Sequence, residues 1–469
     1  MKYTLTLQSE HLIELKSLIL KPDQKERPAI LLCGTSEVNN DIWDGGSEFR
    51  FLSKEIIPIP DDYIHEHTNI SLIWDTSIFR KALKRAKEED LQICLVHSHP
   101  ENLEAFSETD DFHEKELFET LYKRNGFGRP NLSLIITNNN VLIARACTEN
   151  LVYYPIDFIR VIGDRYSFHY KNKYTTIPKE EFHRQQLAFG STLNADLSKL
   201  KIGVVGCGAT GSATAHLLAR LGVGQIVVID NDLVERSNLS RLYGATAEDA
   251  DSGSPKADIL SSFISKIAIG CRIRKIRDWV GGVKSREALK SCDVIFCCTD
   301  DNSGRILLNR FSNFYLIPII DMGIVIDPSK NGSEQLETLQ ARITILQPKN
   351  TCLMCRNIVD RQLAREEDLK RTNPKGYIRQ KEEAYVTGEN NPSPAVITFT
   401  TEAATMAVNE FINRLTGFKK GGPEKHLVRF FDKGVDRRPH TIPDADCPIC
   451  GSNYYWGRGD CEPFLDQVN

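Results

Sequence analysis

Two histidines and an aspartate are the clearest candidates for metal chemistry in this chain. His97 and His99 follow an apolar run over residues 91–96, and because side chains alternate along a strand, both imidazoles point to one face. Asp110 follows Ser107 by about one helical turn. A His-x-His pair alone is more often a pair of ordinary surface histidines. Two imidazoles with one carboxylate, however, leave a fourth tetrahedral position open, as a catalytic zinc ion requires.

The full pattern is His-x-His-Pro, with seven residues between the second histidine and Ser107, and then Asp110 three positions on. It resembles the JAMM/MPN metalloproteases, including the prokaryotic JAB proteins, which remove ubiquitin and related proteins from their attachments. The resemblance implies that His97, His99 and Asp110 bind one catalytic Zn²⁺. It also implies that the Ser107 hydroxyl supports the tetrahedral intermediate.

Such a site needs a general base as well, because a proton must reach the leaving amine. In the family this glutamate stands just before an apolar strand that ends in glycine. The run from Ala29 to Gly34 is such a strand, and Glu26 precedes it by one residue more than in the commonest spacing. We predict Glu26 as the base. Glu37 is the nearest alternative, and an ordinary solvated charge is the other interpretation of Glu26.

A glycine-rich loop marks a second candidate site. Gly206, Gly208 and Gly211 come directly after a predicted strand at 201–205 and at the start of a helical run. Backbone amides without side chains, at the start of a helix, complement the charge of a phosphate. Asp230 closes the next strand, where a carboxylate can hold ribose hydroxyls. These features are compatible with NAD, FAD or ATP.

The residues that follow favour ATP. The stretch from Asp230 to Arg241, then Lys256, then Cys298-Thr-Asp300, and then two Cys-x-x-Cys pairs resemble the ubiquitin-activating superfamily. This superfamily includes the bacterial ThiF, MoeB and HesA proteins, which adenylate the C-terminal carboxylate of a ubiquitin-like protein. The resemblance assigns ATP and Mg²⁺ binding to Gly206, Gly208, Gly211, Asp230, Asp232, Asn238, Arg241, Lys256 and Asp300.

Four of these residues have a clear task in adenylation. Asn238, Arg241 and Lys256 offer donors and positive charge to a triphosphate, and Asp300 would hold Mg²⁺. Carboxylate attack on the α-phosphate builds charge there and on pyrophosphate, so Arg241, Lys256 and Asp300 count as catalytic. A hydride-transfer site needs none of these cations. An NAD-dependent dehydrogenase is therefore the weakest interpretation.

A further motif lies upstream of the glycine loop. The stretch from Phe182 to Gly190, which contains Arg184 and Gln185, resembles the superfamily's Arg-Gln motif, whose arginine reaches the nucleotide of the partner subunit. This implies a homodimer in which Arg184 acts catalytically across the interface. The alternative for Arg184 is a surface charge in a linker.

The two Cys-x-x-Cys pairs, Cys352 with Cys355 and Cys447 with Cys450, predict a second metal site. Four thiolates form a closed tetrahedral zinc site with no position for a substrate, so this Zn²⁺ would be structural. The chain has 13 cysteines and no secretory pattern, and we expect thiols rather than disulfides.

The resemblance fails at one position. Activating enzymes usually carry a nucleophilic cysteine in the crossover segment between the two cysteine pairs, but residues 356–446 contain no cysteine. We expect the enzyme to stop at the acyl-adenylate and to pass it to a conjugating-enzyme-like or other acceptor protein. The alternatives are Cys461, or an ester on Ser393 or Thr387, although a hydroxyl would need an activating base.

Composition limits the class of protein. The 469 residues exceed one typical core, and 41 % apolar residues, 26 % charged residues and a net charge of −4 describe an ordinary globular protein. The chain has no excess of positive charge, so its composition does not point to nucleic-acid or membrane partners. With neither a signal pattern nor a long apolar run, we expect a cytoplasmic location.

The elements predict an α/β protein of two units. Residues 1–155 are predicted as the JAMM/MPN-like α/β domain, residues 156–198 as a linker that contains the Arg-Gln motif, and residues 199–469 as a Rossmann-like ThiF-type adenylation domain with a crossover at about 356–395.

The combined hypothesis is a bifunctional enzyme of a bacterial-type ubiquitin-like modification pathway. It would adenylate a ubiquitin-like protein and, as a zinc peptidase, mature it or remove it from conjugates. One alternative is sulfur-carrier activation and release in cofactor or thioamino-acid biosynthesis. A second is an inactive scaffold stabilised by zinc.

Overall fold

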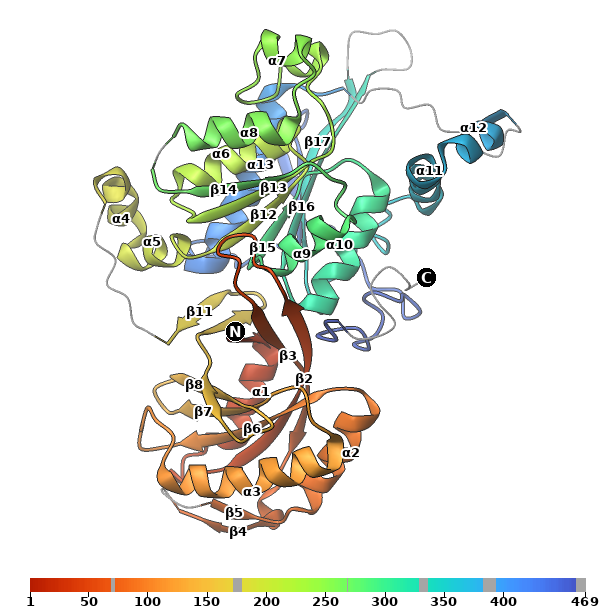
Figure 1. The fold of residues 1–469 in the computed structure, drawn as a ribbon. Coiled ribbons are helices and arrows are strands. Elements are labelled where there is room, and N and C mark those ends of the chain that lie inside the picture. Colours follow the sequence, from red (N-terminus) through yellow and green to blue (C-terminus); the bar gives the residue numbers. More distant parts are fainter. Residues whose placement is uncertain (69–71, 172–178, 268, 329–335, 383–393, 461–469) are drawn as a thin grey trace.

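Two β-sheets, each with helices on both faces, form two units stacked end to end (Figure 1). The computed structural model describes residues 1–68, 72–171, 179–267, 269–328, 336–382 and 394–460. Both units are α/β, which confirms the predicted fold class.

The first sheet has nine strands and is built from the amino-terminal part of the chain. In spatial order its strands are β11 (Ser167–Tyr170), β10 (Phe158–Ile162), β1 (Lys2–Gln8), β3 (Glu48–Pro58), β2 (Pro28–Val38), β6 (Gln92–His99), β7 (Asn131–Thr137), β8 (Leu142–Cys147) and β9 (Tyr153–Pro155). Helix α1 (Ser9–Ile19) packs on one face, and α2 (Ser77–Glu88) and α3 (Glu108–Asn125) pack on the other. Because both faces are covered, the central strand β6 is buried over its whole length.

A short hairpin lies beside this unit, below α3 in Figure 1. It consists of β4 (Ile64–His67) and β5 (Leu72–Trp74), and it follows the 3₁₀ turn η1 (Asp61–Tyr63).

The second sheet has eight strands. In order they are β14 (Arg272–Ile276), β13 (Gln225–Ile229), β12 (Lys201–Val205), β15 (Val294–Cys297), β16 (Ile319–Pro328), β17 (Leu336–Leu346), β18 (His426–Phe430) and β19 (Val435–Arg437). The strands from β14 to β16 are parallel and the rest are antiparallel. Parallel neighbours need crossover helices, and these bring the loops after β12, β13 and β15 to one edge of the sheet.

Helices cover both faces of the second sheet. One face carries α6 (Ala209–Arg220), α8 (Lys256–Ser265) and α13 (Ile397–Thr416), and the other carries α9 (Val283–Lys290) and α10 (Asn302–Tyr315). The remaining elements are η2 (Glu180–Phe182), α4 (His183–Phe189), α5 (Ser191–Leu197), η3 (Arg236–Asn238), α7 (Ala247–Asp251), α11 (Arg361–Thr372) and α12 (Pro374–Glu382). No helix in the described part of the chain combines the length and apolar character that crossing a bilayer requires.

Residues 156–198, expected as a linker, contribute regular structure. Strands β10 and β11 complete the first sheet, and β10 pairs in parallel with β1. Helices α4 and α5 then lead into β12. The chain therefore passes between the units with several anchored elements.

Candidate functional sites

The three predicted metal ligands converge at the end of β6. His97 Nε2 lies 3.1 Å from His99 Nε2 and 3.2 Å from an Asp110 carboxylate oxygen, and His99 Nε2 lies 3.4 Å from the other oxygen. The corners of a tetrahedron with bonds near 2.05 Å are about 3.3 Å apart, so these donors fit one zinc ion. The histidines are buried, and Asp110 comes from the first turn of α3.

Hydrogen bonds hold these ligands in place. The His99 Nδ1–H group donates to the Leu103 carbonyl at 3.0 Å, which leaves Nε2 for a metal. Ser107 is the N-cap of α3: its hydroxyl accepts from the Asp110 amide at 3.1 Å, and its own amide donates to the Asp110 carboxylate at 2.7 Å. This capping box orients Asp110, a structural task beside the role predicted for Ser107.

Glu26 lies next to this triad. One carboxylate oxygen is 3.9 Å from His99 Nε2, and the residue is only 7 % exposed. Its amide donates to the Thr68 carbonyl at 2.8 Å, which links Glu26 to the residue directly after β4. Burial raises the pKa of Glu26 to about 7, where a carboxyl group can both take up and release a proton.

Glu37, the alternative base, lies elsewhere. It belongs to the opposite end of β2, where it pairs with Phe49, whereas Pro28 at the other end of β2 pairs with His97. The structure therefore brings Glu26 to the metal ligands and separates Glu37 from them.

A cleft opens beside the triad, and it contains a residue that the sequence analysis missed. Apolar side chains of Leu72, Trp74, Leu95 and Leu117 line it together with Glu26 and Glu114. Glu114 is 5 % exposed, and its carboxylate accepts from Arg145 Nη2 at 2.7 Å. Because Glu114 follows Asp110 by one helical turn, the i, i+4 spacing was the signal that could have identified it.

The glycine loop after β12 has the tight geometry of a phosphate loop. A Cβ at Gly211 would lie 1.8 Å from the Gly206 carbonyl, and Gly206 itself has φ +90°. At Gly208, by contrast, an added Cβ would meet no described atom within 4 Å. The backbone at Gly208 is therefore open to a ligand at the start of α6.

Acidic and basic groups gather next to this loop. The Asp230 carboxylate accepts from the Cys207 amide at 2.5 Å and from the Asp232 amide at 2.7 Å. Lys256 Nζ lies 2.8 Å from an Asp232 oxygen. Burial alone lowers the pKa of Lys256, but Asp232, Asp230 and Asp300 together raise it, so the lysine stays charged. These residues come from segments far apart in sequence.

Asn238 and Arg241 lie on the turn that follows. The Asn238 side chain accepts from the Glu235 amide at 3.2 Å, and Arg241 Nη1 donates to the Ser237 carbonyl at 2.6 Å. Both side chains thus have partners within the same turn.

Arg184 does not reach the glycine loop of its own chain. Helix α4 is held at the far end of α6, where Gln185 donates to the Leu221 carbonyl at 3.1 Å and Phe182 packs against Gly222. The 12 residues of α6 separate this point from the loop by about 18 Å. The role predicted for Arg184 therefore requires a second copy of the chain.

The four predicted structural ligands also converge. Cys352 and Cys447 are 3.6 Å apart at Sγ, as are Cys355 and Cys450, and all four sulfur atoms lie within 4.8 Å of one another. Zinc–sulfur bonds near 2.3 Å give an edge of about 3.8 Å, so the cluster fits a structural metal ion.

The crossover contributes α11 and α12, and α11 docks on α10 through Glu367, which accepts from the Ser303 amide at 2.8 Å. The three alternative acyl acceptors, Thr387, Ser393 and Cys461, lie outside the described residues.

The fold and the residues that it brings together define the class of protein: an α/β unit with a glycine loop at the end of a parallel strand, joined to an α/β unit with a His-His-Asp cluster that could hold a metal ion. The ThiF family matches residues 182–449, and the prokaryotic homologs of the JAB domain match residues 21–148. The chain belongs to the ThiF family and carries a JAB domain at its amino-terminal side.

Several characterised proteins are similar to this chain. The SAMP-activating enzyme E1 of Haloferax volcanii is 26 % identical over 254 residues, which cover 54 % of this chain and 80 % of that enzyme. The sulfur carrier protein ThiS adenylyltransferase of Escherichia coli is 30 % identical over 122 residues, or 26 % of this chain and 48 % of that protein. The adenylyltransferase and sulfurtransferase UBA4 of Yarrowia lipolytica is 30 % identical over 141 residues, or 30 % of this chain and 35 % of that protein.

Among solved structures, E. coli MccB with ATP is similar, with a TM-score of 0.44 and 18 % identity over 58 % of this chain and 75 % of that chain.

Proposed function

We propose that this chain adenylates the C-terminal carboxylate of a ubiquitin-like protein and, at its second site, hydrolyses amide bonds formed by that carboxylate. The observation that carries the proposal is the presence, on one chain, of a three-residue cluster that could hold a metal ion and of a glycine loop with acidic and basic side chains beside it. Hydrolysis of an amide exposes a carboxylate, and a carboxylate is what an adenylating site consumes. The relatives' names support a ubiquitin-like or sulfur-carrier partner.

The adenylation half is assigned to residues 199–469. The loop at Gly206, Gly208 and Gly211 would receive phosphates, and Asp230 would hold the ribose. Lys256, Asn238 and Arg241 would turn from their present partners to the triphosphate, and Asp300 would hold Mg²⁺, whose charge stabilises the departing pyrophosphate. Arg184 would come from the second subunit of a homodimer.

The hydrolytic half is assigned to residues 1–155. His97, His99 and Asp110 would hold Zn²⁺, which when bound polarises the scissile carbonyl and lowers the pKa of water. Glu26 would accept the proton of the attacking water and deliver it to the leaving amine. Its position supports this role, because Glu26 is buried in the cleft with a carboxylate oxygen 3.9 Å from His99 Nε2.

The four-cysteine cluster would hold a structural Zn²⁺. The acyl-adenylate would pass its acyl group to a separate acceptor protein.

A second candidate function, sulfur-carrier activation, is favoured by the similarity to the ThiS adenylyltransferase. The products distinguish the two: a thiocarboxylate on the small protein indicates sulfur transfer, and an amide link to other proteins indicates conjugation.

The experiment uses the purified chain with ATP, Mg²⁺ and a small ubiquitin-like protein of the SAMP or ThiS kind, the kinds that the relatives' names mention. We expect exchange of labelled pyrophosphate into ATP that depends on a free C-terminal glycine. A small protein that binds without any exchange would refute the adenylation half. The same protein with an amide-linked fluorophore at its C-terminus tests hydrolysis.

A further inference from the structure

The two candidate sites lie at opposite ends of the molecule. In the second unit, the glycine loop follows the carboxyl end of β12, while the amino end of β12 faces the first unit (Figure 1). There the Lys201 amide donates to Asp293 at 2.8 Å, and Asp293 accepts from Arg160 of β10 at 2.6 Å. The nucleotide edge therefore points away from the first unit.

In the first unit, β2 links the junction to the hydrolase site. Its first residue, Pro28, pairs with His97, and its last residue, Val38, leads into the turn that meets the second unit. In that turn Asp41 pairs with Lys201, and Trp43 is buried in the core beneath α9 and α10. The hydrolase site thus faces away from the second unit.

Strand lengths set the separation. Strand β2 has 11 residues and β12 has 5, and a rise of about 3.3 Å per residue makes them about 36 Å and about 17 Å long. Laid end to end, the two strands would span roughly 50 Å, a length that about 15 fully extended residues would be needed to bridge.

A buried ion cluster holds the junction in this arrangement. Glu48 contacts Arg50 at 3.1 Å and Arg160 at 3.3 Å, and Arg50 donates to the Cys292 carbonyl at 3.2 Å. All four groups of the cluster, including Asp293, are at most 3 % exposed. A hinge at this point would expose unpaired charges.

A carboxy-terminal strap, residues 457–460, spans the junction as a second connection. The Gly457 and Gly459 amides donate to carbonyls of α10, and the Asp460 amide donates to the Thr35 carbonyl of β2 at 2.8 Å. Arg458 adds an ion pair with Glu89, just after α2, at 2.7 Å.

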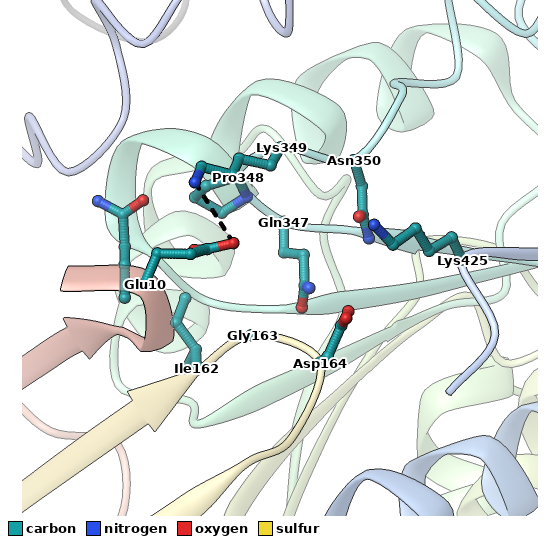
Figure 2. A pocket seen from close by; sticks show the side chains of 10 residues that line it. Glu10, Ile162, Gly163, Asp164, Gln347, Pro348, Lys349, Asn350 and Lys425 are labelled. Carbon is teal, nitrogen blue, oxygen red and sulfur yellow. Dashed lines mark ion pairs between the residues drawn. The ribbon is translucent and has the colours of Figure 1, made fainter. Parts of the chain in front are cut away.

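On another side of the junction, Glu10 of α1 pairs with Lys349 at 3.5 Å across a polar cleft (Figure 2). Connections on several sides leave the units no simple hinge about which the sites could approach each other.

We infer that the two sites act on the ubiquitin-like protein in separate encounters, with release into solution between them. This inference rests on the proposed function. Hydrolysis adds water across the amide and yields the free carboxylate and an amine, and the trimmed protein then leaves. Adenylation in a later encounter joins that carboxylate to AMP and releases pyrophosphate. An acyl-adenylate bound at the nucleotide edge is out of reach of Glu26 in the same chain.

An isotope-dilution experiment tests the inference on the full chain with Zn²⁺, Mg²⁺ and ATP. The probe is the small ubiquitin-like protein, of the SAMP or ThiS kind, that supports pyrophosphate exchange, labelled and extended by a C-terminal peptide tail. A large excess of the unlabelled, trimmed protein is added at the start. We expect labelled acyl-adenylate to fall in proportion to the dilution. If the amount of labelled acyl-adenylate stays the same in the presence of excess unlabelled protein, the labelled protein passes directly from one site to the other, and the inference is overturned.

A time course without the unlabelled protein gives a second readout. We expect a lag in pyrophosphate release while free trimmed protein accumulates, and pyrophosphate release without a lag would contradict separate encounters. Each step is also measured alone, cleavage without ATP and pyrophosphate exchange with trimmed protein. If cleavage alone or pyrophosphate exchange alone fails, the proposed function is refuted. If both steps work alone but the excess of unlabelled protein does not dilute the label in the adenylate, only the inference is refuted.

Discussion

Truncating Trp43 to alanine should destabilise the second unit, although Trp43 belongs to the first. Its side chain is 5 % exposed and packs among buried residues beneath α9 and α10. A buried indole covers about 200 Å², worth about 5 kcal/mol at about 25 cal/mol per Å². Trp43 Nε1, however, has no hydrogen-bond partner among the described residues, and removing a buried, unpartnered N–H offsets about 1–2 kcal/mol of the loss. We therefore expect a loss of about 3 kcal/mol.

Urea unfolding combined with hydrogen exchange measures this loss, because exchange reports each unit separately. We expect faster exchange in β12 and β15 of W43A. Trp43→Phe keeps most of the apolar area and should cost less than about 1.5 kcal/mol. Phe127→Ala is the control, since Phe127 is 69 % exposed and its loss should lie within about 0.5 kcal/mol. A W43A loss no larger than that of F127A, or one confined to the first unit, would refute the reasoning.

Four further predictions follow from the sites. Glu26→Gln should lower amide hydrolysis by a factor of about 10²–10⁴ while the zinc content of the chain stays unchanged; loss of zinc would make Glu26 a ligand instead of a base. Lys256→Ala should abolish pyrophosphate exchange and leave cleavage of a tailed precursor intact, and cleavage lost in parallel would point to misfolding. Cys450→Ser should lower both the zinc content and the Tm of the second unit, whereas His99→Ala should lower the zinc content alone; equal Tm values would argue against a structural metal. Burial, with Arg356 and Arg342 nearby, lowers the pKa of His426 from 6.5 to about 4, so the folded state binds fewer protons than the unfolded chain between these values. His426 should therefore contribute about 3 kcal/mol to the fall in unfolding free energy as pH drops from about 6.5 to about 4, and the fall in His426→Gln should be smaller by about this amount when both proteins are compared by urea titration.

The local chemistry of the sites could be predicted from the sequence because it depends on short spacings. His97 and His99 share a face since a strand alternates, and Asp110 lies in the first turn of a helix capped by Ser107. The glycine loop lies between β12 and α6, where its pattern predicts it. The sequence analysis also identified both cysteine pairs, and the structure brings their sulfur atoms together.

Other features could not be predicted from spacing. The sequence favours Glu26 and leaves Glu37 as an alternative, and the antiparallel register of β2 with β6 separates the two by placing only Glu26 beside the histidines. Glu114 contributes to the cleft through its contact with Arg145, which lies on a different element. The place of Arg184, far from its own glycine loop, follows from the packing of Phe182 and Gln185 at the far end of α6.

The sequence by itself predicted the fold class, the candidate metal ligands and the glycine loop, because each of these depends on short spacings along the chain or on the alternation of strands and helices. Only the tertiary structure decided how the two units face each other. That arrangement depends on contacts between distant segments, such as Arg160 with Asp293, Trp43 in the second core and the strap at residues 457–460. Buried charges need partners and apolar side chains need a core, and here distant segments of the chain supply both. No local sequence pattern specifies which distant segments will meet.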